Sequence, residues 1–174
     1  MGTQIEVIVG NVVDQAADVL ISTANPWLNM SGGVNAEIRE RGGDVVQQEL
    51  RDFLNQSGRS TVLPGSVVLT SAGALSFRHV IHAVGIDPFY DSSVELARTT
   101  LETALTLAAS LKAKTVSLPT IATGYGHLTM TDFAQAFAQA VSNSEFKLSL
   151  IRIVLRSEEN AELIRAALNG LDPA

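Results

Sequence analysis

Residues 19–36 read VLISTANPWLNMSGGVNA, and this stretch decides the fold of the chain. It opens with the apolar run 19–21, which is typical of a buried strand, and passes through small and polar residues to Gly32 and Gly33. The residues from Val34 onward have helical spacing, so the stretch predicts a strand, a glycine-rich loop and a helix in that order. In an open sheet of parallel strands, loops of this kind lie beyond the carboxyl ends of the strands, where ligands bind.

The same signals recur along the rest of the chain. Further apolar runs predict strands at residues 5–9, 67–69, 80–84, 115–118 and 150–155. Helical spacing predicts helices at residues 34–41, 45–54, 92–111, 133–141 and 161–168, the last ending near 169–170. Ser92 and Glu95 have the spacing of a capping box, which predicts that the third of these helices starts at Ser92. Helices that alternate with strands indicate a largely parallel sheet covered on both faces.

The composition is that of one well-packed domain spanning residues 1–174. The chain is 46% hydrophobic and 17% charged, which argues against disorder and for a core large enough to fold alone. It has no cysteine, so disulfides, thiolate metal sites and cysteine nucleophiles are excluded. The sequence shows no signal peptide and no membrane span, so we expect a cytoplasmic protein with no membrane partner.

The charge distribution bears on which partners the chain binds. The formal net charge is −6, and the 12 Lys and Arg residues are spread along the whole length. Because there is no basic run, polymeric nucleic acid is not expected as a main partner. A phosphate ligand would have to be bound by backbone N–H groups and helix N-termini, which do not depend on net charge.

Two loops of the sequence fit that requirement. The first, Ser31 to Asn35, carries Gly32 and Gly33 between a predicted strand and a predicted helix. The second, Ala122 to Gly126, follows the strand predicted at 115–118 and precedes another helix. Either loop alone is more typical of a glycine turn that only caps a helix. Since both follow parallel strands, they are expected to meet at one crevice, and the pair indicates a diphosphate held between them.

Five segments, in the order found here, resemble the macrodomain family, whose members bind ADP-ribose and in some cases hydrolyse ADP-ribosyl groups. The resemblance runs from Gly10 to about Ala167 and rests on Gly10-Asn11-Val12-Val13, Ser22-Thr23-Ala24-Asn25, Ser31-Gly32-Gly33-Val34, Val80-Ile81-His82-Ala83-Val84-Gly85 and Pro119 to Gly126. It implies a three-layer α/β/α macrodomain with a mixed, largely parallel six-stranded sheet. It implies neither a cofactor nor a metal site.

The resemblance also implies roles for individual residues. Asn11 and Val12 would face the adenine, Asn25 and Tyr125 would lie near the terminal ribose, and the two loops would enclose the diphosphate. Arg156 stands where many relatives place an aromatic ring against the adenine. The expected ligand-binding residues are therefore Asn11, Val12, Asn25, Ser31, Gly32, Gly33, Val34, Asn35, Ala122, Thr123, Gly124, Tyr125, Gly126 and Arg156.

Several positions depart from the family pattern. Asn11 replaces an acidic residue that accepts a hydrogen bond from the adenine amino group, and an amide oxygen is a weaker acceptor than a carboxylate. Arg156 either stacks its guanidinium plane on the base or is a solvated surface residue. Ser22 replaces the first Asn of the family motif, Asn35 stands where hydrolytic members often carry Asp, and the second loop is one residue shorter than usual.

Other chemically suggestive residues have simpler interpretations. His79 and His82 flank a predicted strand, but a metal site would need further ligands at suitable spacing, so we expect structural histidines. Glu37 belongs to a charge cluster that is typical of a solvated helix face. Trp27 either covers the site as a lid or anchors its loop.

Three functions remain open on the sequence. The chain could bind ADP-ribose or ADP-ribosylated macromolecules, or it could hydrolyse ADP-ribosyl groups on protein, nucleic acid or O-acetyl-ADP-ribose. Asn25 and Asn35 are candidates for orienting the attacking water, but amides are not bases near neutral pH; a substrate phosphate could assist the water instead. The third function is a scaffold or RNA-binding domain that has lost the nucleotide, in which case Trp27 or Met30 would fill the cleft.

Overall fold

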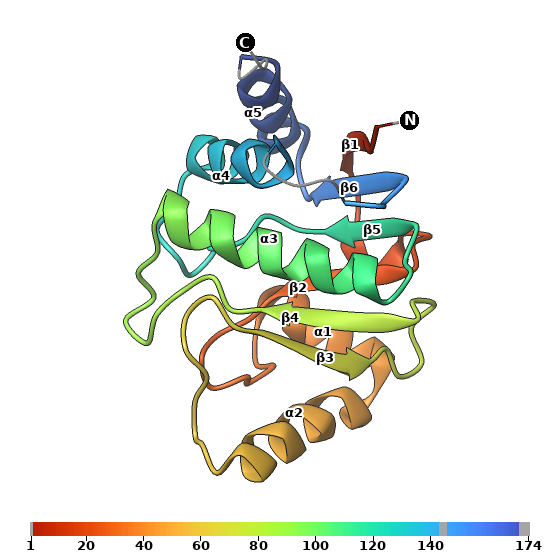
Figure 1. Cartoon of the computed structure of the whole chain (residues 1–174), viewed down its shortest axis with the longest axis vertical. Coiled ribbons are helices and arrows are strands. Elements are labelled where there is room, and N and C mark those ends of the chain that lie inside the picture. The colour runs from red at the N-terminus through yellow and green to blue at the C-terminus, as the bar shows by residue number, and fades with distance from the viewer. Residues whose placement is uncertain (1, 143–145, 171–174) are drawn as a thin grey trace.

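The computed structural model describes residues 2–142 and 146–170, and within them the chain forms six strands, five α-helices and one short 3₁₀ helix (Figure 1). Every strand and helix predicted from the sequence is present. In chain order the elements are β1 (Gln4–Val9), η1 (Val12–Asp14), β2 (Val19–Thr23), α1 (Gly33–Gly42), α2 (Asp44–Ser57), β3 (Val67–Ser71), β4 (His79–Ala83), α3 (Val94–Ser110), β5 (Thr115–Leu118), α4 (Met130–Ser142), β6 (Leu150–Leu155) and α5 (Glu158–Asn169).

The strands form one mixed, largely parallel sheet in the order β1-β6-β5-β2-β4-β3. All neighbouring strands run parallel except β3, which is antiparallel to β4 at the edge of the sheet. The carboxyl ends of β1, β6, β5, β2 and β4 therefore meet at the same edge. The loops that follow these five strands are brought together there, which is the arrangement that the sequence predicts.

Helices cover both faces of the sheet, which gives three layers (Figure 1). Strand β2 shows why: Val19 and Ile21 pack into a core cluster with α3, α4 and α5, whereas Leu20 packs into the opposite cluster with α1 and α2. Successive residues of a strand point to opposite faces, so a strand buried on both faces must be apolar throughout. The run VLI in β2 is therefore a consequence of its central place in the sheet.

Two of the helices begin at serine N-caps. Helix α5 begins after Ser157, whose side chain accepts a hydrogen bond from the Asn160 N–H, as expected of an N-cap. The prediction that Ser92 caps α3 is wrong by one residue. Ser93 is the N-cap and accepts from the Leu96 N–H at 3.0 Å. Ser92 instead donates its hydroxyl to the Gly85 carbonyl at 2.5 Å, a partner that only the folded chain brings near.

His82 on β4 is a structural histidine. Its side chain is completely buried, and its Nε2 lies 2.9 Å from the Thr70 hydroxyl on the neighbouring strand β3. Burial lowers the pKa of His82 from 6.5 to about 4, because the charged ring would lose its hydration. Across the described residues, no three potential metal-ligating side chains lie together, and no helix is long and apolar enough to cross a membrane.

Because His82 is buried in its neutral form, the free energy of unfolding should depend on pH. The unfolded chain takes up this proton near pH 6.5 and the folded chain only near pH 4, so stability is complete above pH 6.5 and falls as the pH drops toward 4. From pH 7 to pH 5 the free energy of unfolding should fall by about 2 kcal/mol on account of this group. Urea unfolding followed by circular dichroism measures the effect. His82→Gln should flatten the profile between pH 7 and pH 5, and an unchanged slope in this variant would contradict the assignment.

Candidate functional site

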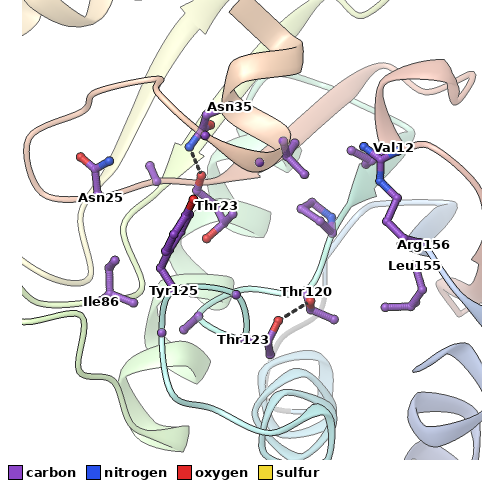
Figure 2. A pocket seen from close by; sticks show the side chains of 18 of the residues that line it. Val12, Thr23, Asn25, Asn35, Ile86, Thr120, Thr123, Tyr125, Leu155 and Arg156 are labelled. Carbon is purple, nitrogen blue, oxygen red and sulfur yellow. Dashed lines mark hydrogen bonds between the residues drawn. The ribbon is translucent and has the colours of Figure 1, made fainter. Parts of the chain in front are cut away.

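A cavity of about 470 Å³ opens at the sheet edge where the parallel strands end (Figure 2). Its walls come from the loops that follow β1, β2, β4, β5 and β6. The residues that line it are Gly10, Val12, Thr23, Ala24, Asn25, Asn29, Ser31, Gly32, Gly33, Val34, Asn35, Ile86, Tyr90, Pro119, Thr120, Ala122, Thr123, Gly124, Tyr125, Gly126, Met130, Val154, Leu155, Arg156 and Asn160. Both predicted phosphate loops, 31–35 and 122–126, therefore face the same crevice.

The structure brings together every predicted ligand-binding residue except Asn11, which does not line the cavity and is the N-cap of η1. The sequence reasoning missed several lining residues. Most of them, such as Gly10, Thr23, Pro119 and Leu155, stand at or directly after the end of a parallel strand. Taking the residues at the carboxyl end of each of the five parallel strands as candidates would have found these. Tyr90 and Met130 carry no such signal in the sequence.

The first loop leads directly into α1. Gly32 is the N-cap of this helix and offers no side-chain cap, and the first backbone bond closes only between the Ala36 N–H and the Gly32 carbonyl. The N–H groups of the first helical turn are therefore left to an outside acceptor, and the helix dipole favours an anion there. Gly33 has φ of +56°, a left-handed conformation that glycine adopts without strain. Val34 and Asn35 follow it along the cavity wall.

The second loop is a tight turn built on backbone contacts. Ala122 adopts a left-handed φ of +63°, and its carbonyl accepts from the Leu128 N–H at 3.1 Å. A Cβ at Gly126 would stand 2.3 Å from the same carbonyl, so only glycine fits at this position. The hydroxyls of Thr120 and Thr123 are 2.6 Å apart across the turn (Figure 2). These contacts hold the loop against the cavity.

Aromatic rings flank one end of the cavity. Tyr125 reaches from the second loop toward the first (Figure 2). Its hydroxyl lies so close to Gly32 that a Cβ added there would stand 2.9 Å from it. Tyr90 stands between Tyr125 and Trp27, with ring centroids 6.2 Å from each. Trp27 therefore packs on the rim, and the cavity is filled neither by Trp27 nor by Met30, which is buried in its wall.

Both catalytic candidates are engaged by the protein itself. Asn25 donates to the Asn29 carbonyl and accepts from the Asn29 N–H, at 2.9 and 3.2 Å. Asn35 accepts from the Ser22 hydroxyl and donates to the Thr23 carbonyl, both at 2.7 Å. The two departures at positions 22 and 35 thus satisfy each other and tie the start of α1 to the end of β2. No carboxylate stands among the described residues that line the cavity.

Glu37 does not belong to a solvated face, and the sequence interpretation of this residue is wrong. Its side chain is 23% exposed and accepts hydrogen bonds from the Asn11 amide and from Arg156, the latter at 2.5 Å. The hydrogen bond from Asn11, and then the bond and charge of Arg156, hold the pKa of Glu37 below its usual value. The pattern of charges along one helix could not reveal this, because both partners come from other elements.

Comparison with known proteins agrees with the geometry. A family model described as Macro domain matches residues 21–137. A relative from Enterobacter sp. (strain 638), named O-acetyl-ADP-ribose deacetylase, is 34% identical, and the match covers 99% of each chain. The chain belongs to the macrodomain family.

Solved macrodomain structures share the fold. A variant of the Oceanobacillus iheyensis macrodomain with ADPR matches with a TM-score of 0.87 at 25% identity, covering 96% of this chain and 92% of that one. The Oceanobacillus iheyensis macrodomain with ADP matches with a TM-score of 0.84 at 25% identity, covering 94% and 90% of the two chains. Those proteins therefore hold ADP-ribose or ADP on the same architecture.

Gly33→Glu should abolish ADP-ribose binding and leave the fold intact. A Cβ at Gly33 meets no atom within 4 Å, but the carboxylate would bring bulk and negative charge to the start of α1. The left-handed φ costs about 1 kcal/mol for a residue other than glycine. Gly58→Glu is the matched control, since Gly58 also has positive φ and open space but ends α2 away from the cavity. Calorimetry and thermal melting measure both variants, and retained affinity in Gly33→Glu would place the diphosphate elsewhere.

Proposed function

We propose that this macrodomain binds ADP-ribose, free or attached to a macromolecule, in the cavity between the two glycine-rich loops. The observation that carries the proposal is the convergence of both loops on one cavity, with the uncapped start of α1 on one side. Backbone N–H groups can bind the diphosphate of a ligand without any lysine, even in a chain with a net negative charge. The macrodomains that hold ADP-ribose or ADP on this fold give independent support.

The orientation of the ligand follows from the two ends of the cavity. One end is formed by Val12, Leu155 and Arg156, where apolar side chains and a guanidinium suit a nucleobase. The other end is flanked by Asn25 and Tyr125, whose polar groups suit the hydroxyls of a ribose. The two phosphate loops lie between these ends, as the order of groups in ADP-ribose requires.

Hydrolysis of O-acetyl-ADP-ribose is the second candidate function. It is favoured by the 34% identical relative that carries this activity in its name and matches over the full length. Against it, Asn25 and Asn35 are already engaged by Asn29, Ser22 and Thr23. None of the described side chains that line the cavity is therefore available to activate water as a general base. A substrate phosphate would take that role.

Calorimetric titration with ADP-ribose tests the binding function, with ADP and AMP as controls. We expect micromolar or tighter binding of ADP-ribose and weaker binding of AMP, which lacks the second phosphate. Absence of heat and of any thermal shift would contradict the proposal. Incubation with O-acetyl-ADP-ribose, followed by chromatography of the products, separates the two functions. A binding module leaves the ester at the rate seen in buffer, whereas faster loss would favour the hydrolase.

A further inference from the structure

The aromatic rings at one end of the cavity form a row that continues beyond its wall. Tyr125 and Tyr90 line the cavity, whereas Trp27 is not among the described residues that line it. The ring centroids of Tyr125 and Tyr90 are 6.2 Å apart, and so are those of Tyr90 and Trp27. The chain has one Trp and two Tyr, so all of them stand in this row, which we call the aromatic rim.

The rings of the aromatic rim are open to solvent. Tyr125 is 73% exposed, Tyr90 41% and Trp27 40%. Rings that only fill a core would be covered by their neighbours, whereas exposed apolar groups gathered beside a cavity are typical of a binding surface. Figure 2 shows Tyr125 and Asn25 at the same end of the cavity, the end that suits the terminal ribose. A group attached to that ribose would therefore leave the cavity along the aromatic rim.

The turn that carries Tyr90 holds this residue in a strained conformation. Tyr90 has φ of +66°, in the left-handed region that residues other than glycine seldom adopt. The Asp87 carboxylate accepts from the Phe89 N–H at 2.8 Å and from the Asp91 N–H at 2.9 Å. The Tyr90 N–H donates to the Asp87 carbonyl at 3.0 Å, which closes the turn. Strain that is held in this way beside a cavity points to a role in binding.

The charge around the aromatic rim is negative. Lys and Arg are absent from the segments that carry the rim and the loops beside it, residues 24–32, 85–95 and 119–129. The same segments hold three carboxylates, those of Asp87, Asp91 and Glu95. Glu95 is paired with Arg98, and Asp87 closes the turn. Asp91 is 69% exposed, and its carboxylate lies 3.2 Å from His127 of the second loop, which is charged only when protonated.

The chemistry of these groups fits a planar cation. Aromatic faces attract a cation placed over them, and a nearby carboxylate adds to the attraction. A guanidinium is planar as well as charged, so it can also stack on the rings of Tyr and Trp. The phosphates of a nucleic acid would be repelled by Asp91 and would find no Lys or Arg in the three segments.

We propose that the aromatic rim and Asp91 bind an arginine side chain to which the ADP-ribose is attached. In that linkage one guanidinium nitrogen is bonded to the terminal ribose, and the group stays planar and positively charged. A target linked through a carboxyl or hydroxyl oxygen has no charge at the link, so it gains neither contact. The inference deepens the proposed function and rests on it, because it names the class of macromolecule whose ADP-ribose enters the cavity.

Calorimetry with two ADP-ribosylated peptides of otherwise equal sequence tests the proposal. One peptide carries ADP-ribose on an arginine, the other carries it on a serine, and free ADP-ribose is the reference. The native chain should bind the arginine-linked peptide about fivefold tighter than the serine-linked one, as expected of cation–π contacts and one exposed carboxylate. Since Trp27 is the single Trp of the chain, its fluorescence should change with the arginine-linked peptide and change less with free ADP-ribose.

Single substitutions separate the rim from the cavity. Trp27→Leu should reduce the preference for the arginine-linked peptide to about twofold and leave the affinity for free ADP-ribose unchanged. Phe53→Leu is the matched control, because Phe53 is 42% exposed and lies on α2, outside the residues that line the cavity. Asp91→Asn should also lower the preference, and Asp52→Asn, at an exposed position of α2, is its control.

The outcomes separate this inference from the proposed function. If the native chain binds neither ADP-ribose nor either peptide, the proposed function and the inference both fall. If it binds ADP-ribose but takes the two peptides equally, or if Trp27→Leu keeps the native ratio, the inference alone falls. Tighter binding of ADP-ribose attached to the terminal phosphate of a short DNA strand would also overturn it. Thermal melting of each variant, together with its affinity for free ADP-ribose, shows that the fold and the cavity are intact.

Discussion

The hydrogen bonds of Asn35 are the constraint on which the site depends. Asn35 lies in the first turn of α1 and joins it to the end of β2 through the Ser22 hydroxyl and the Thr23 carbonyl. Since β2 lies inside the sheet between β5 and β4, these bonds fix the start of α1 to the interior of the sheet. The uncapped N–H groups of that turn are thereby held at the cavity wall opposite the second loop.

An acidic chain that binds a diphosphate must supply positive potential without many cationic side chains. The described part of the cavity wall has Arg156 alone, and its charge is neutralised by Glu37. Under the proposed function, backbone dipoles at the start of α1 and in the turn of the second loop supply this potential. Such dipoles need exact placement, which explains why the second loop accepts a left-handed Ala122 and a glycine at 126 that no larger residue could replace.

Helix α1 also connects the two ends of the cavity. Its first turn lies against the phosphate loops, and Glu37, one turn later, holds Asn11 and Arg156 at the other end. In the proposed binding mode, the phosphate loops and the opposite end of the cavity are thus joined by the same helix. The hydrogen bond between Ser22 and Asn35, and the one between Asn11 and Glu37, show that this chain holds the macrodomain fold with its own set of contacts.

The sequence predicts the fold well because the strands are buried on both faces and must therefore be apolar throughout, as in the run 19–21. It predicts that two glycine-rich loops meet at one cavity, because the glycines follow such strands. It does not predict which of two adjacent serines caps α3, because the choice depends on the Gly85 carbonyl that folding brings to Ser92. It also misreads Glu37, because its hydrogen-bond partners Asn11 and Arg156 lie 26 and 119 residues away along the chain.

The central claim is that backbone amides of the two loops bind the diphosphate. Titration of the ¹⁵N-labelled chain with ADP-ribose, followed through its backbone amide signals, tests this most directly. The account predicts that the largest shifts come from residues 33–35 at the start of α1 and from residues 123–126 of the second loop. Large shifts confined to other parts of the surface, with both loops unchanged, would contradict it.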